Sequence, residues 1–172
     1  MSGTSFDGVD AAIIKTDGKY YIKRLETSFV RYTDNEKALY QSSVLENYKK
    51  ITDIIDNKHK QVIKKIIRKF GKKVDIIGLH GQTFFHNPNY GWTWQYINSK
   101  KIMQYFKINV VSDFRVADIN KGGEGAPLVP IFHKNLILKK NYDLPVGVLN
   151  IGGVSNITII KNKNNFLGFD TG

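Results

Sequence analysis

Residues 8–30 read GVDAAIIKTDGKYYIKRLETSFV, with two strand-like segments on either side of Asp17-Gly18. Val9–Ile14 is apolar, and residues 20–30 alternate between polar and apolar side chains. An Asp-Gly pair between two such segments is a strong hairpin signal, because both residues accept the positive φ of a tight turn. The stretch therefore predicts an antiparallel hairpin, preceded by a loop of small residues at Gly3–Gly8.

Helical patterns follow this hairpin. Thr33 or Asp34 can cap a first helix, with Glu36 placed to return the capping hydrogen bond. A second helix is predicted from about Thr52 to Phe70, since apolar residues recur there every three or four positions. Gly71 then provides the usual helix stop.

The rest of the chain alternates short strands with helices. We expect strands at residues 74–79, 92–97, 108–112, 146–151, 154–160 and 166–169, helices at 98–106 and from Pro127 onward, and loops at 80–83 and 114–125. This order is typical of an α/β fold with a mixed sheet flanked by helices. Neither a repeat nor a linker is evident, so one domain is the first expectation and two small ones the second.

The composition is that of a globular protein. The chain has 172 residues, of which 41% are hydrophobic and 24% charged, too apolar for a disordered chain. The absence of cysteine excludes disulfides, thiolate zinc sites and cysteine nucleophiles. No apolar stretch is long enough to cross a membrane, and MSGTSFDGVD at the N-terminus does not resemble a secretory signal. We therefore expect a cytoplasmic protein with no membrane partner.

The net charge of +11 raises the question of nucleic acid binding. Arginine, the residue that reads guanine edges, is scarce, and the lysines fall mainly on predicted helix faces among isoleucine and asparagine. Net charge by itself informs solubility and non-specific binding. The distribution argues against nucleic acid as the main partner.

Three loops combine glycine with hydroxyl or carboxylate side chains. The first, Gly3–Asp10, could hold an anion against backbone N–H groups, although a tight turn closed by its own hydroxyls explains it equally well. It is not a Walker loop, because no Gly-Lys-Ser/Thr ending leads into a helix.

The second loop carries Arg115 between Asp113 and Asp118, followed by glycines at 122, 123 and 125. Arg115 is either a local brace or a bidentate clamp for a polar ligand. The third loop places Asp170 at the end of an apolar strand, where an ionised carboxylate could accept a proton, although an ordinary turn is the commoner role.

The histidines give no metal site by their spacing. His80, His86 and His133 have no carboxylate at ligand spacing, which argues against metal binding through histidine. No metal-ligating residue is therefore predicted.

Taken together, five segments resemble the anhydro-N-acetylmuramic acid kinase family of the actin, Hsp70 and sugar-kinase superfamily. They are MSGTSFDGVD (1–10), LHGQTFFH (79–86), VSDFRVADINKGGEGAPLVPIFH (111–133), NIGGVSNIT (150–158) and GFDTG (168–172). The resemblance implies a ribonuclease-H-like lobe of the actin-like ATPase and sugar-kinase fold, truncated at both ends. It implies that the 1,6-anhydro ring of anhydro-N-acetylmuramic acid is cleaved with ATP and Mg²⁺. The product is N-acetylmuramate 6-phosphate, a step in peptidoglycan recycling.

By position, the resemblance assigns roles to individual residues. It implies that the ATP-phosphate loop consists of Gly3, Thr4, Ser5, Phe6, Asp7, Gly8, Val9 and Asp10. Asp170 matches the catalytic base that activates the attacking water, and Arg115 matches an arginine near the sugar. Gln82 and Asp118 are further substrate candidates, placed by their loops. Phe6 stands where the family usually has leucine, a change expected to alter packing only.

The family's pattern extends beyond this sequence. A further apolar strand normally precedes MSGTS, and a second domain follows FDTG. We therefore expect residues 1–172 to be a single N-terminal kinase lobe of low stability and inactive alone. Its partner would be a separately encoded C-terminal half or a second copy. The alternative is a non-catalytic remnant or a binding module for sugar, nucleotide or a partner half.

Overall fold

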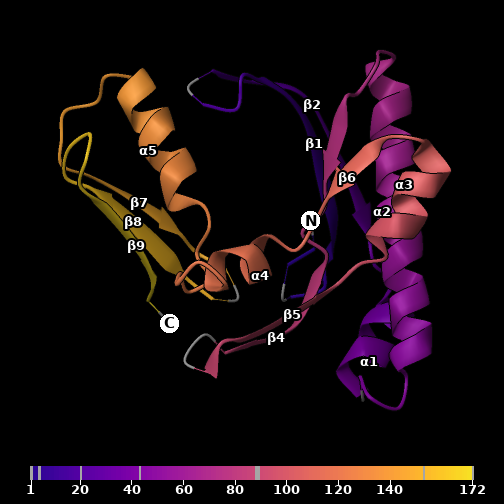
Figure 1. The fold of residues 1–172 in the computed structure, drawn as a ribbon. Coiled ribbons are helices and arrows are strands. Elements are labelled where there is room, and N and C mark those ends of the chain that lie inside the picture. The colour runs from indigo at the N-terminus through magenta and orange to yellow at the C-terminus, as the bar shows by residue number, and fades with distance from the viewer. Residues whose placement is uncertain are drawn as a thin grey trace. The chain divides into compact units, whose positions relative to one another are not determined.

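The computed structural model describes residues 2–3, 5–19, 21–42, 44–87, 90–152 and 154–171. The chain divides into two compact units. The first comprises residues 1–87 and 92–114, and the second comprises residues 88–91 and 115–172. The mixed α/β class is confirmed, with helices and small sheets in each unit (Figure 1). A single lobe over residues 1–172 stays a prediction.

The predicted hairpin is present in the first unit. Strands β1 (Gly8–Thr16) and β2 (Ile22–Arg31) pair antiparallel, with Val9 opposite Val30. The Asp17 carboxylate accepts hydrogen bonds from the N–H groups of Lys19 and Tyr21 at 2.9 and 2.8 Å. Gly18 adopts a φ of +77°, which side chains other than glycine rarely accept. The predicted hairpin is therefore confirmed, but of the Asp-Gly pair only Gly18 adopts a positive φ, while Asp17 contributes through its carboxylate.

Two helices follow, and the predicted start signal of the first and stop signal of the second both act as expected. Helix α1 (Asp34–Ser42) opens with a capping box in which Thr33 and Glu36 exchange hydrogen bonds of 2.7 and 3.3 Å. Helix α2 (Tyr48–Phe70) begins before the predicted Thr52 and ends at Gly71, whose N–H donates to the Ile67 carbonyl at 3.0 Å.

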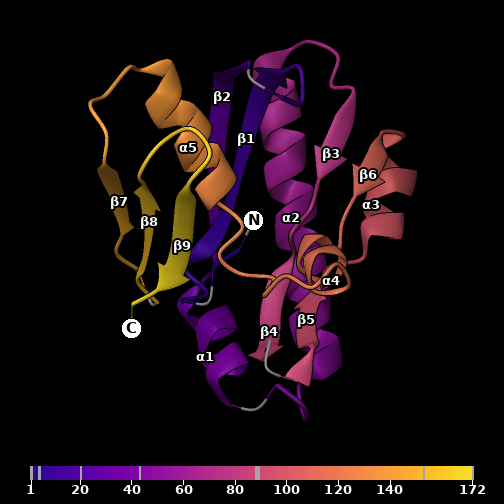
Figure 2. The same ribbon diagram turned by 60° about the vertical axis from the view of Figure 1, so that its left-hand side comes forward.

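Helix α2 covers the β1–β2 hairpin and supplies one side of the first unit's core (Figures 1 and 2). Its apolar stripe faces the strands, as the period of the sequence predicts. The buried cluster consists of Phe6, Val9, Tyr32, Ile51, Ile55, Val62, Ile63, Ile77, Leu79 and Ile102.

Two more strand pairs and a helix complete this unit. Strand β3 (Ile76–Gly78) pairs parallel with β6 (Asn109–Val111), and β4 (Gln82–Asn87) pairs antiparallel with β5 (Trp92–Tyr96). Helix α3 (Ser99–Phe106) is capped by Asn98, whose Oδ1 accepts the Lys101 N–H at 2.9 Å. The predicted loop at 80–83 is too long. Gln82 already pairs with Tyr96, and this long-range pairing leaves no local sequence signal.

Ser2 connects the hairpin to strand β4. It forms an antiparallel bridge with Val9 and a parallel bridge with Gln82, and its side chain is buried. Ser2, which leads into the Gly3–Asp10 loop, therefore lies between β1 and β4.

The second unit is built on strands β7 (Val146–Asn150), β8 (Asn156–Ile160) and β9 (Phe166–Asp170), which pair antiparallel in that order. Helix α5 (Pro130–Lys139) packs against β8 and β9 (Figure 2). Pro130 occupies its first turn, so the helix does not open at Pro127 as predicted.

Helix α4 (Phe114–Ile119) occupies part of the stretch predicted as loop 114–125. The glycines that suggested a loop lie only after the helix, at positions 122, 123 and 125. The prediction from composition alone therefore placed the start of the loop too early in the chain, at Phe114.

Candidate functional site

The N-terminal loop forms a turn whose polar atoms are partly engaged with one another. The Phe6 N–H donates to the Gly3 carbonyl at 3.2 Å. The Ser5 hydroxyl donates to the Asp7 carboxylate at 2.8 Å, and Lys37 lies 3.8 Å from the same carboxylate. Gly3, Ser5 and Asp7 are exposed, as a loop that meets a ligand requires. Thr4 lies outside the described residues.

The other predicted loop residues belong to strand β1. Val9 is fully buried, Gly8 is buried beneath the Phe29 ring, and the Asp10 side chain is exposed. A Cβ on Gly8 would collide with that ring and approach the Val30 carbonyl to 2.6 Å. Only glycine therefore fits where the loop enters the strand.

Phe6 anchors the loop in the core. Its ring stacks between Tyr32 and Tyr40, with centroid distances of 3.7 and 4.2 Å, and only 2% of the residue is exposed. Its backbone adopts a φ of +53°, uncommon for a residue with a side chain. Burial raises the pKa of Tyr32 to about 12 and also raises the pKa of Tyr40, so both phenols are neutral. A ligand in the loop could meet only the backbone of Phe6.

Gln82 lies beneath the same turn and is fully buried. Its Nε2 donates to the Gly3 carbonyl at 3.2 Å and to the Thr83 carbonyl at 3.3 Å, and lies 3.5 Å from the Tyr40 hydroxyl. Its Oε1 accepts a short hydrogen bond from Ser2. The amide of Gln82 thus contacts the loop directly, and a role in sugar binding stays a prediction.

In the second unit, Asp118 organises the glycine loop that follows α4. Its Oδ2 accepts the Gly125 N–H at 2.8 Å, and its carbonyl accepts the Gly123 N–H at 3.0 Å. The backbone at Gly123 passes so close to this carboxylate that an added Cβ would collide with it. Asp118 therefore shapes this loop, and contact with the sugar stays a prediction for it as well.

Arg115 and Asp170 interact electrostatically within the second unit. Arg115 is half-buried on α4, and Asp170 is exposed at the end of β9. Burial lowers the pKa of the Arg115 guanidinium, while the negative charge of Asp170 acts in the opposite direction. The charge of Asp170 therefore acts on Arg115 within this unit. Whether they share a site with the Gly3–Asp10 loop of the first unit stays a prediction.

Sequence reasoning missed the residues that support the N-terminal loop. Ser2, Tyr32 and Tyr40 come from three separate segments and meet around Phe6 and Gln82. No spacing rule links these positions, because Ser2 precedes β1, Tyr32 follows β2 and Tyr40 lies on α1. The burial of Gln82, which gives its amide the need for partners, is visible only in the structure.

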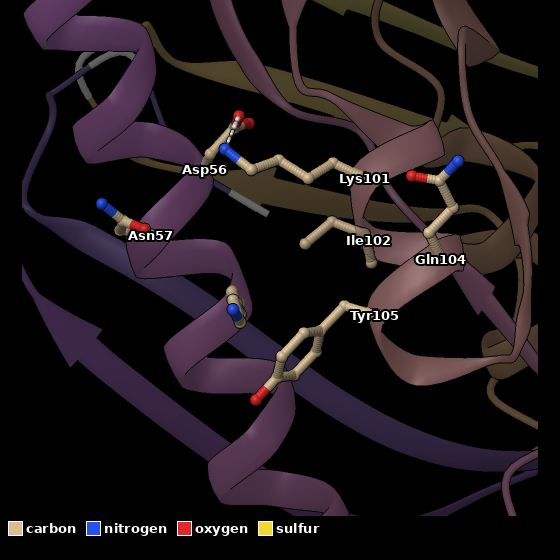
Figure 3. A pocket seen from close by; sticks show the side chains of 7 residues that line it. Asp56, Asn57, Lys101, Ile102, Gln104 and Tyr105 are labelled. Carbon is tan, nitrogen blue, oxygen red and sulfur yellow. Dashed lines mark ion pairs between the residues drawn. The ribbon is translucent and has the colours of Figure 1, made fainter.

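A pocket of about 320 Å³ lies elsewhere in the first unit, between α2 and α3 (Figure 3). At its rim, Lys101 extends toward Asp56, with 3.6 Å between the ammonium and the carboxylate. Asp56 also accepts the Asn98 N–H at 3.1 Å, and the Lys60 ammonium lies 3.5 Å from the centre of the Tyr105 ring. These contacts join the two helices, and no predicted site residue lines the pocket.

Within the described ranges, no three histidine, aspartate or glutamate side chains gather in a way that could hold a metal ion. Across the same part of the chain, no helix has the length and apolar character to cross a membrane.

A mixed α/β fold hosts many unrelated functions, so the fold by itself does not identify the family. The family profile of anhydro-N-acetylmuramic acid kinase matches residues 1–172. The chain belongs to the anhydro-N-acetylmuramic acid kinase family, which confirms the resemblance seen in its motifs.

Curated relatives support this assignment over the whole chain. The anhydro-N-acetylmuramic acid kinase of Zymomonas mobilis is 38% identical and that of Pelagibacter ubique 40% identical. Both alignments cover all of this chain, but only 52% and 50% of the respective relatives. The kinase of Rhodopseudomonas palustris is 36% identical, with 51% of its length covered. The chain spans about half the length of the curated relatives it matches.

Proposed function

We propose that this chain provides one half of an anhydro-N-acetylmuramic acid kinase. The complete enzyme would cleave the 1,6-anhydro bond of the sugar and transfer the γ-phosphoryl group of ATP to it. The product would be N-acetylmuramate 6-phosphate, an intermediate of peptidoglycan recycling in the cytoplasm. The family match over residues 1–172 is the observation that carries this proposal.

The first unit would hold the phosphates. The exposed turn at Gly3, Ser5 and Asp7 offers backbone donors, a hydroxyl and a carboxylate, and the close approach permitted by glycine suits a bulky anion. These oxygen donors also suit Mg²⁺, which keeps several waters and is bound through few carboxylates together with substrate phosphates. The Asp7 carboxylate is the candidate protein ligand. The ion would neutralise charge on the transferred group.

The second unit would orient the sugar and the water. Asp170 is exposed, so its carboxylate can receive a proton from water as that water attacks the anomeric carbon. The bond between the anomeric carbon and the oxygen of the 1,6-anhydro bridge breaks, and this released oxygen accepts the γ-phosphoryl group of ATP, with ADP as the leaving group. The electrostatic interaction with Arg115 would position both side chains beside the sugar.

The half-length match leads us to propose that the chain alone turns over no substrate. Phosphoryl transfer depends on positioning, so loss of part of the site removes the reaction as a whole. The remaining surface would come from the part of the relatives' length that residues 1–172 do not match.

A complementation assay tests this function. The 172-residue chain is incubated with ATP, Mg²⁺ and anhydro-N-acetylmuramic acid, alone and fused to the part of the Pelagibacter ubique relative that it does not match. We expect sugar phosphate only from the fusion, and Asp170→Asn should lower its turnover by about two to four orders of magnitude. Asp143→Asn, on a loop outside the proposed site, is the matched control. Normal turnover of the Asp170→Asn fusion would remove the assigned base.

The half-length match also favours a second function, in which the chain binds ligand without turnover. Calorimetry of the chain with ATP and with the sugar distinguishes the two. Binding heat together with an inactive fusion would favour the binding module, whereas an active fusion supports the kinase half.

A further inference from the structure

We infer that Gln82 is a positioning residue that holds the Gly3–Asp10 loop in the shape that receives phosphate. This inference rests on the proposed function of the loop as an ATP-phosphate site. It assigns Gln82 to the nucleotide side of the reaction, whereas its motif suggested the sugar.

The first observation is burial. Gln82 has no exposed surface, so its amide can reach a ligand only through the residues that cover it. Ser2, which is also buried, lies against it through both a backbone bridge and a side-chain hydrogen bond. A direct contact between Gln82 and a sugar would require these buried contacts to open.

The second observation is that both the nitrogen and the oxygen of the Gln82 side-chain amide form hydrogen bonds. Nε2 donates to the Gly3 carbonyl, and Oε1 accepts from the Ser2 hydroxyl, so two consecutive residues at the start of the loop are held by one side chain. A buried group with these partners needs a donor and an acceptor together. Glutamate would lose the donor and bury a charge, and methionine would lose both.

The third observation links this contact to the shape of the turn. The Gly3 carbonyl that Gln82 holds is also the acceptor for the Phe6 N–H, which closes the turn. Phe6 is in turn clamped between Tyr32 and Tyr40. Gln82 and the aromatic clamp therefore fix the two ends of the Gly3–Phe6 turn, and Ser5, between them, is exposed.

Fixed donors matter for phosphate binding because an anion gains most from N–H groups that are already aligned. Without this hydrogen bond to the Gly3 carbonyl, the turn would sample other conformations. The loop would then have to become ordered when phosphate binds, which weakens binding. The expected signature is weaker phosphate binding in a chain whose strands and helices remain folded.

The test compares Gln82→Met with Gln95→Met in the 172-residue chain. Gln95 lies on β5, the partner strand of β4, and is half-buried with its amide on Thr93, so it controls for glutamine loss in this sheet. Ser2→Ala is a milder variant that removes one hydrogen bond to the amide and keeps the core filled. Hydrogen exchange is measured at the Ser5, Phe6 and Asp7 amides, with the Ala12 and Thr27 amides as reference. Titration with Mg²⁺-ATP gives the dissociation constant.

We expect Gln82→Met to accelerate exchange at the loop about tenfold and to weaken ATP binding by a similar factor. Ser2→Ala should act in the same direction with a smaller effect, while Gln95→Met changes neither quantity. Unchanged loop exchange in both Gln82→Met and Ser2→Ala would overturn the inference. Faster loop exchange with unchanged ATP affinity would overturn it too, since the loop shape would then not matter to phosphate.

Failure of the proposed function gives a different result. If the unsubstituted chain shows no heat with Mg²⁺-ATP, the phosphate site of this chain is rejected, while its loop exchange still reports whether Gln82 holds the turn. If Gln82→Met does not fold, Ser2→Ala provides the decision by the same two measurements.

Discussion

At the residue scale, the first unit combines polar side chains that need partners with an apolar core. Gln82 satisfies its amide through Ser2, Gly3 and Thr83, whereas His59 does not satisfy its ring fully. The Nδ1 of His59 lies 2.8 Å from the Ile55 carbonyl, and within the described residues its buried Nε2 has no hydrogen-bond partner. The Gln82 amide, with its partners, can hold a loop in place. The His59 ring, with one nitrogen unpartnered in the described part of the chain, makes the free energy of unfolding depend on pH.

His59 should make the chain less stable in mild acid. Burial lowers the pKa of His59 from 6.5 to about 4, so the folded state resists protonation that the unfolded state accepts. The contribution is complete above pH 6.5 and is lost as the pH falls toward 4. Between about pH 7 and pH 5 we expect a loss of about 2 kcal/mol in the free energy of unfolding, measured with urea.

The control for this prediction is a pair of substitutions. His59→Leu should reduce the pH dependence by that amount, while His86→Gln, at a half-buried ring bonded to Thr93, should retain it. Burial also lowers the pKa of His133, so part of the slope should remain in His59→Leu. An identical slope in His59→Leu and the unsubstituted chain would contradict the assignment.

At the element scale, the ends and close contacts of helices and strands depend on single glycines. Gly71 ends α2 in the left-handed conformation, and Gly168 lets β9 approach α5.

The sheet of the second unit has α5 against one face, where Thr158 and Ile160 are buried. Leu149 and Leu167, on β7 and β9, are 57% and 58% exposed.

Gly71→Ala should destabilise the chain through backbone conformation alone. The φ of Gly71 is +67°, and a Cβ there would meet no atom within 4 Å, so no collision contributes. We expect a loss of about 1 kcal/mol in the free energy of unfolding, measured by urea titration. Lys72→Ala, at the exposed neighbouring position, should leave it within about 0.5 kcal/mol. Equal stability of Gly71→Ala and the unsubstituted chain would contradict the cap.

Gly168→Ala should disturb the strand that carries Asp170, because its Cβ would collide with the Pro130 ring on α5. Overpacking of this kind costs about 1–3 kcal/mol. Gly147→Ala is the matched control, since its Cβ would meet only Ile157, at 3.9 Å. Hydrogen exchange of the β9 amides measures the effect. Equal protection of the β9 amides in the two variants would contradict this prediction, because α5 would then have moved aside without loss of stability.

At the scale of the whole molecule, the chain carries +11 and divides into two compact units. The predicted phosphate loop belongs to the first unit, and Arg115 and Asp170 belong to the second. The fusion assay therefore tests residues from both units in one reaction.

The net charge should produce only weak, salt-sensitive binding to nucleic acid. Titration with random-sequence duplex DNA should give a dissociation constant of about 10⁻⁴–10⁻⁶ M at physiological salt. The affinity should fall steeply as the salt concentration rises. Calorimetry or fluorescence anisotropy at two salt concentrations measures this. Tight binding that is insensitive to salt would contradict the interpretation of the lysines as solvated helix faces.

The sequence by itself determined the hairpin turn at Asp17-Gly18, the capping box of Thr33 and Glu36, and the end of α2 at Gly71. These signals act within a few residues, so local sterics and hydrogen bonding suffice to predict them. It also determined the family, because several motifs in order are specific even when each one is weak.

Only the tertiary structure decided which distant side chains meet. The pairing of Ser2 with Gln82 and the clamp of Phe6 between two tyrosines join positions far apart in the chain. Strand β4 was missed for the same reason, since its pairing depends on β5 and Ser2. Such contacts are selected by packing and burial over the whole unit, and a local pattern carries no information about them.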